Sequence, residues 1–172
     1  SSEDRESMMD DTLRLYHTQV VEVWENFCRL HRDLFDLTCD EYQALLSGEI
    51  ETLEVLVARK EAVMAEINAW EATRAALIED MNARGASPEP ITNVSGLLQA
   101  LRVPEAQLPI PALTNLNSLL LDIITKTHAQ NKRNQLFLNR ALLNIRDLRE
   151  GFSGKRTYTT YGANGMARAS GR

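Results

Sequence analysis

Cys28 and His31 are the residues whose types and spacing come closest to a chemical site. Three residues apart, they place a thiol and an imidazole on one face of a helix. Zinc needs two more ligands, and the nearest further cysteine is Cys39, eleven residues along the chain. The sequence also contains no phosphate-binding glycine loop, nucleophile elbow or histidine–glutamate zinc motif. We therefore expect no metal, no cofactor and no enzymatic activity.

Four polar residues within apolar stripes are candidates for setting helix register. Lys60 and Arg74 interrupt an apolar face, where long stems cover the core edge while the charged heads reach water. Alternatively, each pairs with an acid on the first helix and fixes the register. Asn131 and Asn134 lie in the polar centre of the third helical block. We interpret them as register-setting residues, in preference to a ligand site.

The elements that position these residues follow from where the helix breakers fall. All five prolines lie within 85–111, and this segment separates long stretches that are nearly free of glycine. Apolar residues recur at helical spacing in each stretch, and from Leu13 to Leu37 they alternate three and four residues apart, as in a heptad seam. The sequence predicts long helices at about 4–46, 49–84 and 112–150.

These helices predict an all-α fold, an elongated antiparallel helical bundle or coiled coil of three long helices. Gly48 leaves room for a short turn, so the first two helices fold back as a hairpin, the alternative being one kinked rod. A short helical segment is expected in the 85–111 connection. Residues 1–150 then form the helical domain, and residues 151–172, which hold five of the eight glycines, form a flexible and mostly disordered tail.

Both cysteines are expected to be free thiols. Eleven residues span ~16 Å along one helix, whereas a disulfide needs Cα atoms within ~7 Å. Two free thiols fit a reducing compartment, and no apolar stretch reaches the ~18 residues of a membrane span. We therefore expect a cytoplasmic protein without membrane insertion.

Charge and apolar residues are unevenly distributed toward the C-terminus. The segment 151–172 holds four basic residues and no acid, but without a run of five like charges we expect no nucleic-acid partner. Residues 136–148 are apolar around nearly the whole helix. One face can enter the bundle, and the remainder is an exposed patch that suits an amphipathic helix of a partner or, alternatively, a homodimer interface.

Several short segments in this order resemble the FlgN family of flagellar export chaperones. A long acidic helix leads to LLSGEIETL at 45–53, NKRN at 131–134 opens the apolar run, and TYTTYGANG follows at 157–165. The similarity extends from about 13 to 165. Asn131 and Asn134 match the family's asparagine pair, and Tyr161, Gly162 and Gly165 match its tail motif.

The resemblance implies a cytosolic, non-enzymatic chaperone. Such a protein binds the C-terminal amphipathic helix of hook–filament junction (hook-associated) proteins, prevents their premature assembly and delivers them to the flagellar type III export apparatus. The alternative is a self-associating structural coiled coil, or scaffold, without a client. A symmetric dimer that buries the apolar patch would favour the scaffold.

On the chaperone interpretation, the apolar end of the third long helix binds the client, and the tail docks onto the export gate. The expected client-binding residues are Leu138, Leu142, Ile145, Arg146, Arg149 and Phe152. The expected docking residues are Tyr158, Tyr161, Gly162 and Gly165. The alternative for the tail is that it only adds solubility.

Overall fold

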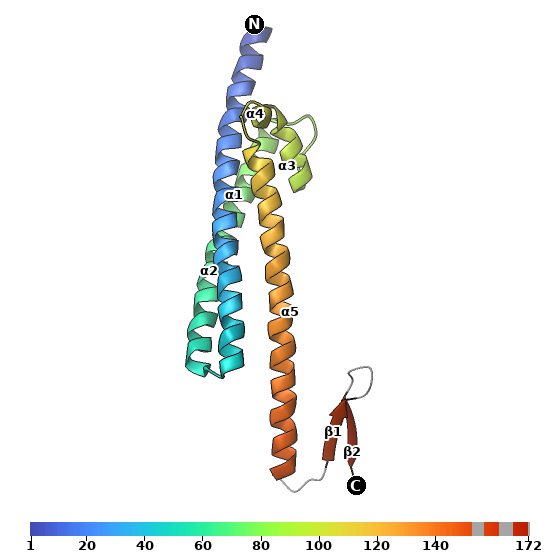
Figure 1. Ribbon diagram of the computed structural model, residues 1–172. Coiled ribbons are helices and arrows are strands. Elements are labelled where there is room, and N and C mark those ends of the chain that lie inside the picture. Colours follow the sequence, from blue (N-terminus) through green and yellow to red (C-terminus); the bar gives the residue numbers. More distant parts are fainter. Residues whose placement is uncertain (153–156, 162–166, 172) are drawn as a thin grey trace.

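The computed structural model describes residues 1–152, 157–161 and 167–171 (Figure 1). Three long helices dominate it: α1 (Ser2–Ser47), α2 (Ile50–Ala83) and α5 (Ala112–Phe152). Two short helices, α3 (Val94–Ala100) and α4 (Arg102–Ala106), lie in the connection between α2 and α5. Two strands, β1 (Thr157–Tyr161) and β2 (Ala167–Gly171), pair antiparallel near the C-terminus.

The chain reverses direction at Gly48. This residue has φ 67° and ψ 25°, a left-handed conformation that glycine adopts without steric cost, and its N–H donates to the carbonyls of Ala44 and Leu45. α2 therefore folds back along α1, as the sequence predicted, and the single kinked rod is wrong. In Figure 1, α1 runs downward, α2 returns upward and α5 runs downward again.

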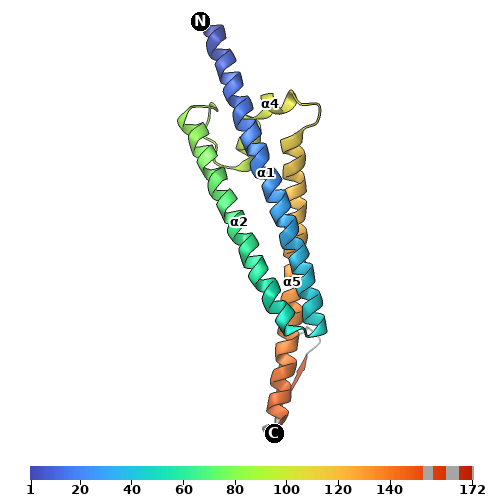
Figure 2. The same ribbon diagram turned by 90° about the vertical axis from the view of Figure 1, so that its left-hand side faces the viewer.

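The three long helices do not end at the same level. Both α2 and α5 pack along α1. Figures 1 and 2 agree that α5 continues well past the turn between α1 and α2. The C-terminal part of α5 therefore has neither long helix beside it, which sequence periodicity alone did not predict.

The main core lies at the end of the molecule where α2 ends and α5 begins. Trp24 and Phe27 of α1 pack there with Met81 of α2, and the rings of Trp24 and Phe27 meet edge to face at 5.6 Å. The 85–111 connection is part of this core. Its residues in this buried core cluster are Ile91, Leu97, Ala100 and Leu101. The connection thus fills the core rather than merely crossing the end of the helices.

Glu105 of α4 fixes where α5 starts. Its carboxylate accepts hydrogen bonds from the backbone N–H of Leu113 at 3.1 Å and of Thr114 at 2.7 Å. It also lies 2.9 Å from Nε2 of His17 on α1, and both side chains are largely buried. The first turn of α5 would otherwise present these N–H groups without partners. Glu105 therefore joins the beginning of α5 to α1.

The C-terminal segment is more regular than expected. α5 extends to Phe152, and β1 and β2 form a hairpin in which Tyr158 pairs with Ser170 and Tyr161 with Ala167. The expectation of a mostly disordered segment is therefore wrong for these strands. Threonine and tyrosine are both enriched in strands, and the glycine count outweighed that signal in the sequence interpretation. Gly162 and Gly165 lie outside the described residues.

Both cysteines are free thiols, as the sequence predicted, with Cys28 buried and Cys39 partly buried. Burial raises the pKa of the Cys28 thiol, which donates to the carbonyl of Leu116 at 3.4 Å. Burial, aided by nearby Asp36 and Asp40, also raises the pKa of Cys39. Across the part of the chain that the structure describes, no helix is both long and apolar enough to pass through a membrane.

Candidate functional site

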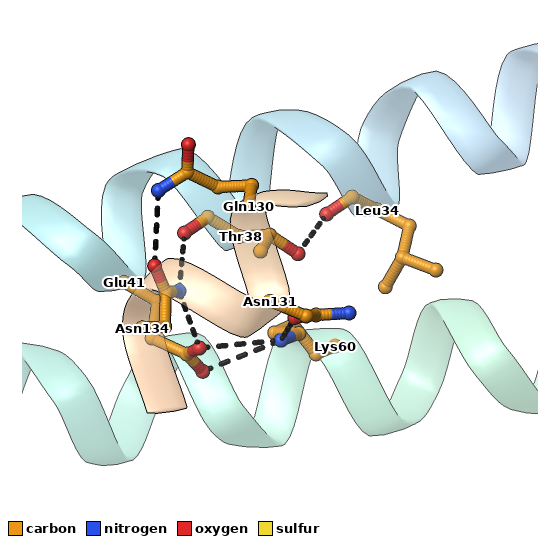
Figure 3. Close-up of polar contacts among 7 residues, drawn as sticks. All are labelled: Leu34, Thr38, Glu41, Lys60, Gln130, Asn131 and Asn134. Atoms are coloured by element: carbon orange, nitrogen blue, oxygen red, sulfur yellow. Dashed lines mark hydrogen bonds and ion pairs between the residues drawn. The ribbon is translucent and has the colours of Figure 1, made fainter. Parts of the chain in front are cut away.

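A buried polar network joins α5 to the C-terminal part of α1 (Figure 3). Asn134 of α5 is 4% exposed, and its Nδ2 donates to the backbone carbonyl of Thr38 and to Oε1 of Glu41, each at 2.9 Å. Its Oδ1 accepts from Nε2 of Gln130 at 3.0 Å. The side-chain amide of Asn134 thus uses both its donor and its acceptor.

Lys60 brings α2 into the same network. Its Nζ lies 3.4 Å from both carboxylate oxygens of Glu41 and 3.4 Å from Oδ1 of Asn131. The structure therefore brings together three of the four polar residues singled out from the sequence (Figure 3). Glu41 was not identified from the sequence, where a pair between Lys60 and an acid on the first helix was the alternative to a charged head that reaches water.

Arg74 does not join this network. It pairs instead with Glu71 of its own helix, with N–O distances of 2.8 Å. Residues three apart on a helix are surface neighbours, and this pairing competes with any acid on α1. The structure thus places Arg74 in a local ion pair within α2.

Beyond the polar network, α5 leaves the other long helices. The rings of Tyr42 and Phe137 meet edge to face at 6.2 Å, and the α1–α2 turn follows within a few residues. We define residues 138–152 of α5 as the overhang. At 1.5 Å per residue it is ~22 Å long.

One face of the overhang is an exposed apolar stripe. Leu138, Leu142, Ile145, Arg149 and Phe152 follow one another at alternating spacings of four and three residues, so they share this face. The exposed fraction is 55% for Leu142 and 89% for Phe152. The sequence-predicted client-binding residues therefore lie along or beside this stripe, and beyond Leu138 no other described long helix lies over it.

Leu148 and Arg146 lie at the two edges of the stripe. Leu148 was not among the expected binding residues, although it is 62% exposed and lies one turn beyond Ile145. Its place in the apolar run of 136–148 was the available signal. Arg146, which was among the expected residues, pairs with Glu150 at 3.5 Å. The stripe thus has basic groups along it and at its flank.

The opposite face of the overhang is partly covered. Leu143, Asp147 and Glu150 point away from the stripe by helical geometry, and all three are only partly exposed. β1 contacts α5. The hairpin side and the stripe side of the overhang are therefore different faces, and the stripe stays open.

A cleft opens where the overhang begins. It has a volume of about 340 Å³ and lies between the α1–α2 turn and α5. Its apolar lining comes from Leu45, Leu53, Val57 and Leu138, and the network residues Glu41, Lys60, Asn131 and Asn134 line it as well. Leu138 belongs to both the cleft and the stripe, so the two surfaces are continuous.

The remaining sequence candidates form no chemical site. Within residues 1–152 and the two strands, no three metal-ligating side chains come together. His31 packs edge to face on Phe27, with ring centroids 6.4 Å apart, and burial lowers its pKa. Cys28 and His31 therefore serve as packing groups in the structure.

The comparisons with known proteins point to one family. The sequence model of a family described as FlgN protein matches residues 16–169. Neither the search of curated proteins nor the search of solved structures gives a significant match.

Proposed function

The chain belongs to the FlgN family of flagellar export chaperones, and from this premise we propose that it binds hook–filament junction proteins through the overhang. The bound element is the C-terminal amphipathic helix of the client. Binding there would hide the client's own assembly surface and keep it competent for the flagellar type III export apparatus. We propose that the protein acts in the cytoplasm, without catalysis and without a cofactor.

The observation that carries this proposal is the exposed stripe at the end of α5. Leu142, Ile145 and Phe152 present apolar side chains to solvent in the overhang, which extends beyond the turn between α1 and α2. Burying one such side chain contributes about 1.5–3 kcal/mol. An amphipathic client helix laid along the stripe would take the place that α1 occupies higher on α5.

The basic C-terminal segment suits a second contact. Tyr158 and Tyr161 lie in β1, and tyrosine is enriched among residues that dominate binding energy. We propose that this segment docks onto the export gate while the overhang holds the client. The two activities would then use separate parts of the chain.

Co-purification with each hook–filament junction protein of the source bacterium tests the proposal. We expect a stable complex that is lost when the C-terminal helix of the junction protein is removed. Light scattering on the same samples should show one copy of the chaperone in the complex. A stable symmetric dimer that binds no junction protein would instead support the scaffold alternative.

A further inference from the structure

The cleft beside Leu138 is suited to one large apolar side chain. Leu45, Leu53 and Val57 form its apolar walls together with Leu138, and its volume of about 340 Å³ leaves room for a leucine or phenylalanine side chain. Lys60 and Asn134, which line it with Glu41, already have partners in the polar network. An apolar group entering the cleft therefore need not break these interactions.

Charge changes sign between the cleft and the far end of the overhang. Residues 40–61, around the α1–α2 turn, hold six acids and two bases, Arg59 and Lys60. Residues 139–152 of the overhang hold three bases, Arg140, Arg146 and Arg149, and two acids, Asp147 and Glu150, which lie on the face opposite the stripe. A helix lying along the stripe would therefore have an acidic surface at one end and a basic surface at the other.

This gradient distinguishes the two directions in which a client helix can lie. A helix carries partial positive charge at its N-terminus and partial negative charge at its C-terminus. A segment at the end of a chain adds a terminal carboxylate to the negative end. The favourable arrangement puts the N-terminal end of the helix at the acidic turn and the carboxylate near Arg149.

We infer that the client helix lies parallel to α5, with one large apolar side chain near its N-terminal end in the cleft and its C-terminal end beside Arg149. This inference rests on the proposed function and adds the direction of the partner helix and a specificity pocket for it. α2, through Leu53 and Val57, thereby becomes part of the client-binding site.

Cysteine cross-linking tests the direction. Val57→Cys and Arg149→Cys are introduced singly in a Cys39→Ser background, where Cys28 stays buried. The junction protein carries one cysteine, placed either in the last turn of its C-terminal helix or three turns earlier. Each chaperone variant is mixed with each junction-protein variant, and the mixture is treated with a short bismaleimide. Leu138, beside Val57, is eleven residues from Arg149, or ~16 Å along the helix, so the two positions are distinguishable.

We expect the last-turn cysteine to cross-link to Arg149→Cys and the earlier cysteine to cross-link to Val57→Cys. The reverse pattern would overturn the proposed direction. Cross-linking of Val57→Cys to a second copy of the chain, in preference to the client, would assign the cleft to self-association and would also overturn it.

Filling the cleft tests the pocket separately. Val57→Trp should reduce affinity for the junction protein at least tenfold, whereas Val55→Trp should leave it unchanged. The control is matched, since Val55 is 59% exposed on the same helix and outside the cleft, while Val57 is 42% exposed. Circular dichroism establishes that both variants are folded.

Leu142→Asp separates failure of this inference from failure of the proposed function. If Leu142→Asp abolishes binding while Val57→Trp binds like the wild type, the overhang binds the client and the cleft inference is wrong. If Leu142→Asp also binds like the wild type, the proposed function of the overhang itself is wrong. A dimer that Val57→Trp separates would show a second copy in the cleft and would contradict the inference.

Discussion

The side-chain amide of Asn134 on α5 donates a hydrogen bond to the backbone carbonyl of Thr38 on α1, 2.9 Å away. The Thr38 hydroxyl donates in turn to the carbonyl of Leu34 at 2.7 Å. A slip of α5 by one turn would leave the Asn134 amide buried without partners. The contact therefore specifies where α5 sits on α1 and, with it, how far the overhang extends.

Removing this contact should destabilise the helix pairing. Asn134→Ala leaves Thr38 and Glu41 without their amide donor, and we expect the free energy of unfolding to fall by about 1–3 kcal/mol. Asn131→Ala is the control, because the Asn131 side chain makes a single 3.4 Å contact at an exposed position. Urea denaturation measures both. Equal losses for the two variants would mean that the buried network does not hold α5 in register.

Client binding should depend on the exposed stripe. Leu142→Asp places a charge opposite an apolar partner surface, and we expect affinity for the junction protein to fall at least about tenfold, or 1.4 kcal/mol. Leu121→Asp is the matched control, because Leu121 is 57% exposed on the same helix but outside the overhang. Isothermal titration calorimetry compares the two, and unchanged binding by Leu142→Asp would place the client elsewhere.

Export-gate docking should depend on a tail tyrosine. Tyr161→Ala is expected to leave client affinity nearly unchanged and to reduce both binding to the export gate and secretion of the client. Tyr158→Ala and the double variant identify which tyrosine matters. Secretion at the wild-type level in all three strains would exclude the docking role.

The Glu105 joint should make stability depend on pH. Burial alone would raise the pKa of Glu105, but hydrogen bonds from Thr114, His17 and Leu113 outweigh it and hold the pKa below its usual value. A lowered pKa means that the stabilisation is present above the pKa of the unfolded chain, ~4.3, and is lost as the pH falls through the folded value.

Glu105→Gln should therefore lower the free energy of unfolding at pH 7 by about 1–3 kcal/mol, and the difference from the wild type should shrink below about pH 4. Glu89→Gln, an exposed position in the same connection, is the control. Denaturation curves of the wild type and the two variants at pH 7 and pH 3 give the six values. A difference between Glu105→Gln and the wild type that grows toward acid pH would contradict the assignment.

The two thiols should differ in reactivity. Burial raises the pKa of Cys28 and its side chain is enclosed, so little thiolate is available to an alkylating reagent. Cys39 is partly buried and should be alkylated first in the native protein. Mass spectrometry after iodoacetamide treatment follows both residues. After denaturation without a reductant both should react fully, and protection at that stage would indicate a disulfide.

Local patterns in the sequence predicted the helices and the turn well. Gly48 and Gly85 both have positive φ, as expected for residues that end long helices. The heptad seam of α1 is buried at six of its eight positions, and Leu13 and Leu34 are partly exposed. These features depend on residues that are close together in the sequence, so the spacing of apolar residues and glycines predicts them directly.

Features that depend on distant partners were less predictable. Val57 and Met64 belong to an apolar row of α2, yet each is more than 40% exposed, because periodicity identifies an apolar face and not the element that covers it. Ile91 lies among prolines without an apolar period, and the sequence did not predict its burial in the core. Arg74 pairs with Glu71 on its own helix.

The main core and the overhang occupy opposite ends of α5, with the polar network between them. Substitutions in the overhang therefore remove little that holds the chain folded, since Leu142 and Phe152 contact no described core residue. Substitutions of Trp24 or Leu113 would instead lower the free energy of unfolding, because both residues belong to the main core. Residues 138–152 can thus vary during evolution with little loss of stability.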